Sequence, residues 1–255
     1  MFIDTHAHIY TDAFKDEYAE IVERAREANV NRILMPNIDA KSMKDVMDLH
    51  KMYPDACFPM VGLHPCSVNE SFEEELDKLA EYLSKKEIIA VGEIGIDLYW
   101  DKTFEKEQTL AFRIQIQWAK KYDLPIVIHS RSSIDKTIEI VREEQDGSLR
   151  GVFHCFSEGI EEAKEIMDVG FYMGIGGVST FKKTQDLRDT IAKIPLDHIL
   201  LETDAPYLTP MPYRGKRNES SYIPYIADTV AKVKKLSIEE IAEKTTANAE
   251  ALFRL

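Results

Sequence analysis

The chain contains few of the residues that mark secreted, membrane-spanning or disordered proteins. It has 255 residues, with 11 Gly, 10 Pro and three cysteines, Cys57, Cys66 and Cys155, that show no CxxC spacing. This composition, 44% apolar and 30% charged, excludes a disulfide scaffold, a collagen-like chain and a disordered one. No stretch approaches the roughly 18 apolar residues of a membrane span, and the opening MFIDTHAHIY lacks the basic and apolar regions of a secretory signal. We therefore expect a globular protein of the reducing cytoplasm that does not associate with membranes.

Positive charge is scarce as well. The chain has 32 Lys and Arg against 45 Asp and Glu, a net charge of −13. Proteins that coat long duplexes depend on basic side chains that neutralise phosphates, so this balance disfavours such a role. It remains compatible with an enzyme that grips a few phosphates through metal ions and a local basic loop.

The sequence does contain a repeated pattern of short, β-branched apolar runs, each followed by an amphipathic helical pattern. The runs recur roughly every 28 residues, the size of a βα unit, and begin near Phe2, Arg32, Cys57, Ile88, Leu124, Gly151, Phe171 and His198. Eight alternating units predict an α/β fold, a (β/α)8 TIM barrel that occupies residues 1–255 as a single domain. A doubly wound open sheet is the alternative, but its Gly-rich fingerprint is missing after the first run.

Two helix starts can be predicted from capping residues. Asp12 precedes an apolar face that includes Phe14, Ile21 and Ala25, which predicts a helix capped at Asp12. Ser237, with Glu240 three residues on, predicts a capping box at the start of the last helix.

Metal-ligating residue types follow five of the eight predicted strands. In a barrel the carboxyl ends of the strands meet at one mouth, so these side chains should converge there. His6 and His8 alternate along the first run and should point to the same side. The full candidate ligand set is His6, His8, Glu93, His129, His154 and Asp204.

Six ligands exceed the three or four that one catalytic zinc ion takes from a protein, so we expect two divalent ions per chain. Glu93 is the candidate bridge, because a carboxylate can bind two ions while an imidazole binds one. Mixed imidazole and carboxylate ligands suit Zn²⁺, Mn²⁺, Fe²⁺, Co²⁺ or Ni²⁺, and accommodate Mg²⁺ when water completes its shell. Two metal ions held close together suit the hydrolysis of phosphodiesters, amides or lactones. Glu93 and Asp204 are the candidate catalytic residues, with Asp204 as the candidate general base.

Candidate substrate contacts lie in the same loops. Arg214, Lys216 and Arg217 fall within four residues after the eighth run, and a basic cluster in an acidic protein fits an anionic substrate. Arg131 joins this patch or pairs with a carboxylate. His64 binds a phosphate or is structural, and Tyr99, beside Trp100, stacks a base or belongs to the core.

These residues, in this order, resemble the TatD family of metal-dependent deoxyribonucleases, within the amidohydrolase-like metal barrels. The stretches that carry the resemblance run from residue 2 to residue 253: FIDTHAHI, VGLHP, VGEIGID, PIVIHSR, GVFHCFS, LLETDAPYLTP, PYRGKRNES and TANAEALF. The resemblance implies that the six candidate ligands bind metal, that His64 contacts substrate, and that the loop Arg214 to Asn218 grips phosphate. It also implies divalent-metal-dependent hydrolysis of DNA, often as a 3′→5′ exonuclease on single strands, with Mg²⁺ or Mn²⁺ as the working metal.

Three alternatives remain open from the sequence. An amidohydrolase acting on a small ester, lactone or amide is one, although many such enzymes bridge their ions with a carbamylated Lys on the fourth strand, and here that strand supplies Glu93. Hydrolysis of aminoacyl-tRNA esters is the second, and a non-catalytic metal-binding protein the third. Nothing in the sequence points to an obligate protein partner.

Overall fold

The computed structural model describes residues 1–255 and contains eight parallel strands, each near one of the predicted runs. The strand bounds differ from the predicted starts by three residues at most, the largest difference being at β4. The strands are β1 (Phe2–Asp4), β2 (Val30–Met35), β3 (Cys57–Pro59), β4 (Val91–Asp97), β5 (Ile126–Arg131), β6 (Gly151–Phe153), β7 (Tyr172–Ile175) and β8 (Ile199–Leu201).

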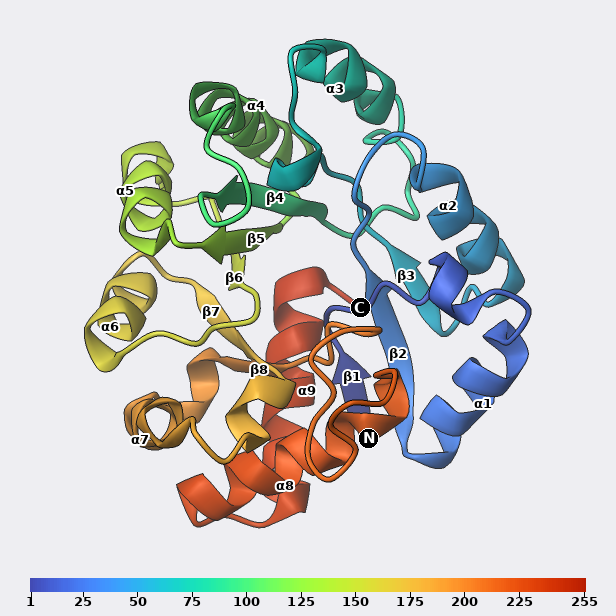
Figure 1. The fold of residues 1–255 in the computed structure, drawn as a ribbon, viewed down its shortest axis with the longest axis vertical. Coiled ribbons are helices and arrows are strands. Elements are labelled where there is room, and N and C mark those ends of the chain that lie inside the picture. Colours follow the sequence, from blue (N-terminus) through green and yellow to red (C-terminus); the bar gives the residue numbers. More distant parts are fainter.

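Helices follow the strands and surround them (Figure 1). Their bounds are α1 (Tyr18–Glu27), α2 (Met43–Met52), α3 (Phe72–Ala80), α4 (Glu105–Tyr122), α5 (Ile134–Glu144), α6 (Ile160–Asp168), α7 (Gln185–Lys193), α8 (Ile223–Lys234) and α9 (Ile238–Phe253). No helix has both the length and the apolar character needed to cross a membrane.

The strands form a (β/α)8 TIM barrel whose two seams are held by few hydrogen bonds. Strands β1 to β3 form one continuous parallel sheet and β4 to β8 another. A bridge between Val61 and Val91 joins β3 to β4, and a bridge between Ala7 and Ala205 joins the segments that follow β1 and β8. The backbone N–H of Thr5 also donates to Leu201 O at 3.1 Å. The predicted barrel is therefore confirmed.

Alternation along the strands separates two apolar layers. The larger has 59 buried residues, including Ile33, Val91 and Ile128, and lies largely between the strands and the surrounding helices. The smaller has ten, of which seven come from the strands or the residues beside them: Ile3, Leu34, Met60, Ala90, Val127, Val152 and Leu200. Ala249, Leu252 and Phe253 of α9 complete this second layer, so the end of α9 covers the barrel interior away from the strand carboxyl ends.

One predicted helix start is confirmed and one is wrong. Ser237 caps α9, with its hydroxyl accepting from Glu240 N–H and the Glu240 side chain accepting from Ser237 N–H. Asp12 does not cap α1; it begins a single 3-10 turn, Asp12–Phe14. The chain then passes through Asp16 in the left-handed region, φ 67°, which ends that turn. Helix α1 begins only at Tyr18.

Candidate metal centre

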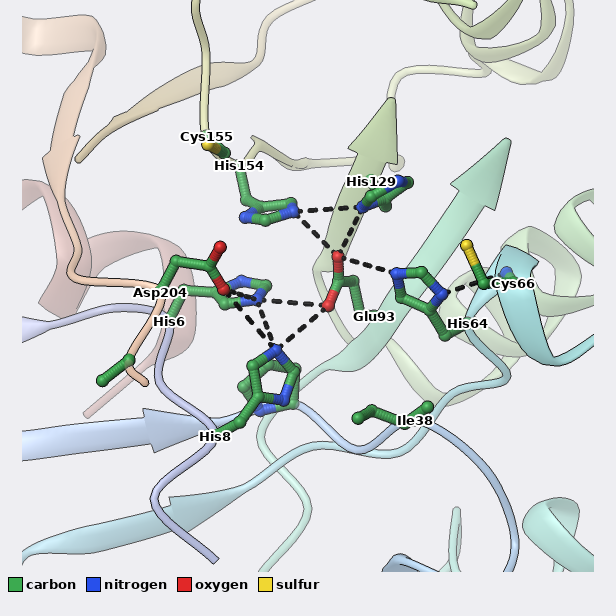
Figure 2. Close-up of polar contacts among 12 residues, drawn as sticks. His6, His8, Ile38, His64, Cys66, Glu93, His129, His154, Cys155 and Asp204 are labelled. Atoms are coloured by element: carbon green, nitrogen blue, oxygen red, sulfur yellow. Dashed lines mark hydrogen bonds and ion pairs between the residues drawn. The ribbon is translucent and has the colours of Figure 1, made fainter. Parts of the chain in front are cut away.

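The six candidate ligands converge at the carboxyl ends of the strands (Figure 2). His6 and His8 follow β1 on either side of Ala7, the residue that bridges to Ala205. Glu93 lies within β4 and His129 within β5, while His154 directly follows β6 and Asp204 follows β8. Glu93 is at the centre and only 2% exposed.

The two carboxylate oxygens of Glu93 face two different groups of imidazoles. Oε2 lies 3.2 Å from His6 Nε2 and 3.4 Å from His8 Nε2. Oε1 lies 2.8 Å from both His129 Nδ1 and His154 Nε2. This is the arrangement expected of a carboxylate that bridges two cations.

Asp204 completes the first of these groups. Its Oδ1 lies 3.8 Å from His6 Nε2 and 3.7 Å from His8 Nε2. Asp204 therefore faces the same two imidazole nitrogens as Glu93 Oε2, from the other side of the space between them (Figure 2).

A local irregularity in β4 accompanies this position of Glu93. Val91 pairs with Ile126 whereas Ile94 pairs with Ile128, so β4 has one extra residue relative to β5 between these points. Such a bulge breaks the in–out alternation of a strand and re-aims a side chain. From Ala90, which lies in the inner layer, regular alternation would have turned Glu93 toward the helices.

The donor atoms fit divalent cations. His6 Nε2 and His8 Nε2 approach to 3.3 Å, and His129 Nδ1 and His154 Nε2 to 3.4 Å, each pair beside one oxygen of Glu93. Imidazole nitrogens that face one another over a carboxylate offer converging lone pairs that one cation can share. Nδ1 of His6 and Nδ1 of His154 are buried without a hydrogen-bond partner, although the Glu202 carboxylate lies 3.5 Å from Nδ1 of His154.

Hydrogen bonds behind two rings aim a lone pair into the site. The Tyr10 hydroxyl donates to Pro36 O at 2.8 Å, so its oxygen accepts from His8 Nδ1–H at 2.9 Å and leaves Nε2 unprotonated. His129 Nε2 lies 2.8 Å from Asp97 Oδ2, which favours a proton on Nε2 and leaves Nδ1 facing Glu93. Partners of this kind orient metal-binding histidines and increase their basicity.

His64 presents a proton instead of a lone pair. The backbone N–H of Cys66 donates to its Nδ1 at 3.0 Å. The proton of the neutral ring is therefore on Nε2, which lies 3.3 Å from Glu93 Oε1. This orientation suits donation to an anionic oxygen better than metal binding.

The pKa values of the two central carboxyls differ. Burial acts to raise the pKa of Glu93, but His154, His64 and His6 outweigh it and hold that pKa well below the usual range. Burial raises the pKa of Asp204 to about 6. A pair of carboxyls with separated pKa values can divide the roles of permanent anion and proton acceptor.

Two acidic residues at the site were not among the sequence candidates, Asp97 and Glu202. Glu202 Oε1 lies 3.5 Å from His154 Nδ1 and accepts from Cys155 N–H at 2.5 Å. Gly174 makes room for this carboxylate, since a Cβ there would lie 2.1 Å from Glu202 Oε2. Asp97 lies in GEIGID with Glu93, and Glu202 lies in ETD with Asp204. Their position close to a candidate ligand along the chain is the sequence signal that could have identified them.

The basic loop after β8 divides into engaged and available cations. Arg217 is engaged: its Nη2 lies 2.6 Å from Glu17 Oε2, and Nη1 donates to Ala13 O. Arg214 is exposed, forms no ion pair, and stacks over the Phe181 ring at 3.9 Å. Lys216 is also exposed and free of ion pairs. Arg214 and Lys216 are thus the cations of this loop that form no ion pair, while Arg217 anchors the loop.

A (β/α)8 barrel with imidazoles and carboxylates gathered at its strand ends defines the class of metal-dependent hydrolases. The family model for TatD related DNase matches residues 3–254, and the chain belongs to this family.

The chain aligns with its relatives over nearly the full length of each. The chain is 38% identical to the uncharacterized metal-dependent hydrolase YabD of Bacillus subtilis, with all of both chains covered. It is 30% identical to a protein of Erwinia tasmaniensis named 3′-5′ ssDNA/RNA exonuclease TatD, with 99% of each covered. The crystal structure of the TatD homologue YjjV of Escherichia coli matches with a TM-score of 0.94 and 30% identity, over 100% of this chain and 98% of that one.

Proposed function

We propose that the protein is a divalent-metal-dependent nuclease that removes nucleotides from single-stranded DNA, as a 3′→5′ exonuclease. The observation that carries this proposal is the division of Glu93, whose two oxygens each face a separate pair of imidazole nitrogens. That division supports a site for two ions bridged by Glu93. Two-ion sites are common in enzymes that hydrolyse phosphodiesters.

His6, His8 and Asp204 would hold one ion and His129 and His154 the other, with Mg²⁺ or Mn²⁺ in the working enzyme. When bound, two divalent ions lower the pKa of water and offset the charge of a phosphate group. Zn²⁺, Ni²⁺, Fe²⁺ and Co²⁺ are compatible with the same donors.

The chain's own residues would transfer the proton and bind the phosphates. Asp204, whose Oδ1 alone faces His6 and His8, accepts a proton from the attacking water through its other oxygen. His64 donates from Nε2 to a phosphate oxygen, since its Nδ1 is already used by Cys66. Arg214 and Lys216, which form no ion pairs, hold phosphates further along the strand.

Two observations favour nucleic acid over a small molecule as the substrate. Arg214 and Lys216 are free to contact phosphates, and the Erwinia tasmaniensis relative is named an exonuclease. The matches to amidohydrolase and lactonase structures, at 17% identity or less, bear on the fold alone. Hydrolysis of a small ester, lactone or amide, or of aminoacyl-tRNA esters, becomes the alternative if DNA is not cleaved.

The test is a cleavage assay on 5′-labelled single-stranded DNA. Chelator-treated protein is reloaded with Mg²⁺ or Mn²⁺ and compared with Asp204→Asn. We expect a metal-dependent ladder that shortens from the 3′ end and is lost in the variant. A matched RNA strand shows whether the enzyme requires deoxyribose. Intact DNA with protein that has demonstrably rebound both ions would overturn the nuclease proposal.

A further inference from the structure

Two large aromatic side chains stand in solvent beside the candidate metal centre, just after β4. Tyr99 is 57% and Trp100 69% exposed. Their rings meet edge to face with centroids 5.0 Å apart. The guanidinium of Arg131, the last residue of β5, lies 4.1 Å from the centre of the Tyr99 ring and 5.3 Å from that of Trp100. We call Tyr99, Trp100 and Arg131 the rim shelf.

The rim shelf is not explained by packing. Most of each aromatic ring is outside the core, so burial contributes little to keeping two large rings here. Arg131 is exposed and forms no ion pair with any carboxylate, which leaves its charge available to a ligand. Although Arg131 lies over both rings, Tyr99 and Trp100 are each more than half exposed, so aromatic surface and a guanidinium charge are accessible at one place on the mouth of the barrel.

The backbone under the rim shelf is held in place, and by a residue that also holds a candidate ligand. Asp97 Oδ1 accepts from the backbone N–H of Tyr99 at 2.9 Å and of Trp100 at 3.1 Å. Asp97 Oδ2 lies 2.8 Å from His129 Nε2. The strands are in register here, since Asp97 pairs with Arg131. The rim shelf is therefore positioned relative to the metal centre before any substrate binds.

We propose that the rim shelf is a base-stacking subsite that takes an unpaired nucleobase of a single strand whose phosphate lies at the metal centre. The inference rests on the proposed nuclease function and specifies how its substrate is selected. Every nucleobase has a π-face that stacks on aromatic rings and guanidinium planes, so such a subsite is tolerant of sequence. In a duplex those faces are covered by neighbouring base pairs, so the rim shelf selects single strands and unpaired ends.

Binding can be measured separately from cleavage. The chain has two tryptophans, Trp100 and Trp118, so Trp118→Phe leaves Trp100 as the only indole reporter. The metal-loaded variant is titrated with a short oligothymidylate whose phosphorothioate links resist hydrolysis, and with an abasic oligomer of the same length and charge. We expect the thymine-bearing strand to quench Trp100 emission and to bind roughly five- to one-hundred-fold more tightly than the abasic strand.

Substitutions then assign the difference to the rim shelf. Trp100→Leu and Tyr99→Leu keep an apolar side chain and remove an aromatic face. Each should reduce the preference for thymine while leaving the affinity for the abasic strand unchanged. Tyr82→Leu is the matched control, because Tyr82 also lies under a cation, with Lys85 Nζ 4.9 Å from its ring centre, but belongs to the segment that follows α3.

The outcomes separate this inference from the nuclease proposal. Equal affinity for both strands, or unchanged Trp100 emission, overturns the rim shelf even if the native enzyme cleaves DNA. A thymine-dependent preference that Trp100→Leu removes supports the rim shelf even if the native enzyme, loaded with metal, leaves DNA intact. That last result would overturn only the proposed nuclease activity.

Discussion

Asp97 Oδ2 lies 2.8 Å from Nε2 of His129, on the side of the ring opposite Glu93. Asp97 is the last residue of β4 and His129 lies within the neighbouring strand β5, so this contact joins β4 to β5 at the mouth of the barrel. It keeps the proton of His129 on Nε2 and directs the lone pair of Nδ1 to the space that Glu93 faces. Asp97, which is not a candidate ligand, thereby orients the candidate ligand His129 and sets its tautomer.

Replacement of Asp97 by Asn should weaken metal binding while the fold persists. Loss of the carboxylate behind a metal-binding histidine typically lowers metal affinity about 10- to 100-fold. The measurement is a calorimetric titration of chelator-treated protein with Mn²⁺. Asp101→Asn is the control, because Asp101 is exposed and its carboxylate accepts from the backbone of Thr103 and contacts no candidate ligand. Wild-type affinity in Asp97→Asn would rule out this positioning role.

Glu93→Ala should abolish activity and release metal from both positions, because one carboxylate serves both imidazole groups. Elemental analysis of the purified variant, reloaded and dialysed, measures the ions retained per chain. Asp204→Asn is the comparison, since Asp204 faces only His6 and His8 and its loss should weaken one position. Two ions retained by Glu93→Ala would refute the bridging assignment.

Arg214 and Arg217 should respond differently to replacement by Ala, although they are three residues apart. Arg214→Ala is expected to raise KM for long DNA with little change in kcat, because a phosphate contact distant from the reaction is equal in ground and transition states. Steady-state kinetics on long and very short strands checks this, since short strands do not reach Arg214. A collapsed kcat with unchanged KM would instead give Arg214 a role in the transition state.

Arg217→Ala should act through the fold. Its guanidinium pairs with Glu17 and stacks over Phe14 at 4.6 Å, so its loss frees the loop after β8 from the segment before α1. We expect a lower melting temperature in a thermal unfolding experiment, which Arg214→Ala should leave unchanged. Equal melting temperatures for all three proteins would contradict the anchoring role.

The stability of the fold should depend on pH through Asp4. Burial raises the pKa of the Asp4 carboxyl to about 7, against the hydrogen bonds donated by Thr203 and His6. Because the folded state keeps this proton while the unfolded chain, with a pKa of about 3.9, releases it, the free energy of unfolding falls as pH rises between these values. The slope from this group is at most ~1.4 kcal/mol per pH unit, and above about pH 7 it vanishes.

Denaturant unfolding of wild type and Asp4→Asn in the presence of a chelator isolates that contribution. The variant should become more stable relative to wild type as pH rises from 4 to 7, because it carries no proton to lose. A constant difference between the two proteins over this range would show that Asp4 is ionised in the folded state.

Local sequence patterns predicted the strands closely because each barrel strand is a short apolar run. The starts of β1, β3 and β6 were predicted to the residue, while β4 begins three residues later than expected. The predicted start of α1 was wrong because the apolar pattern begins at Phe14, before the helix itself begins at Tyr18. Phe14 is fully buried from a 3-10 turn, so its burial does not require it to lie in α1.

The sequence by itself determined which side chains would meet. Side chains at the carboxyl ends of parallel strands must converge when the sheet closes, so His6, His129 and Asp204 could be placed together from their positions after apolar runs. The same logic could have included Asp97 and Glu202, which lie in the same stretches.

Only the tertiary structure decided how those side chains are used. The extra residue in β4 shows itself only against β5, and it accompanies the inward position of Glu93. The proton on His64 is set by a turn, and the engagement of Arg217 depends on Glu17, which is 200 residues away along the chain. Strand register, histidine tautomer and ion pairing depend on atoms that folding brings together. Residue type and the apolar pattern of a strand, by contrast, can be read from a short stretch of sequence.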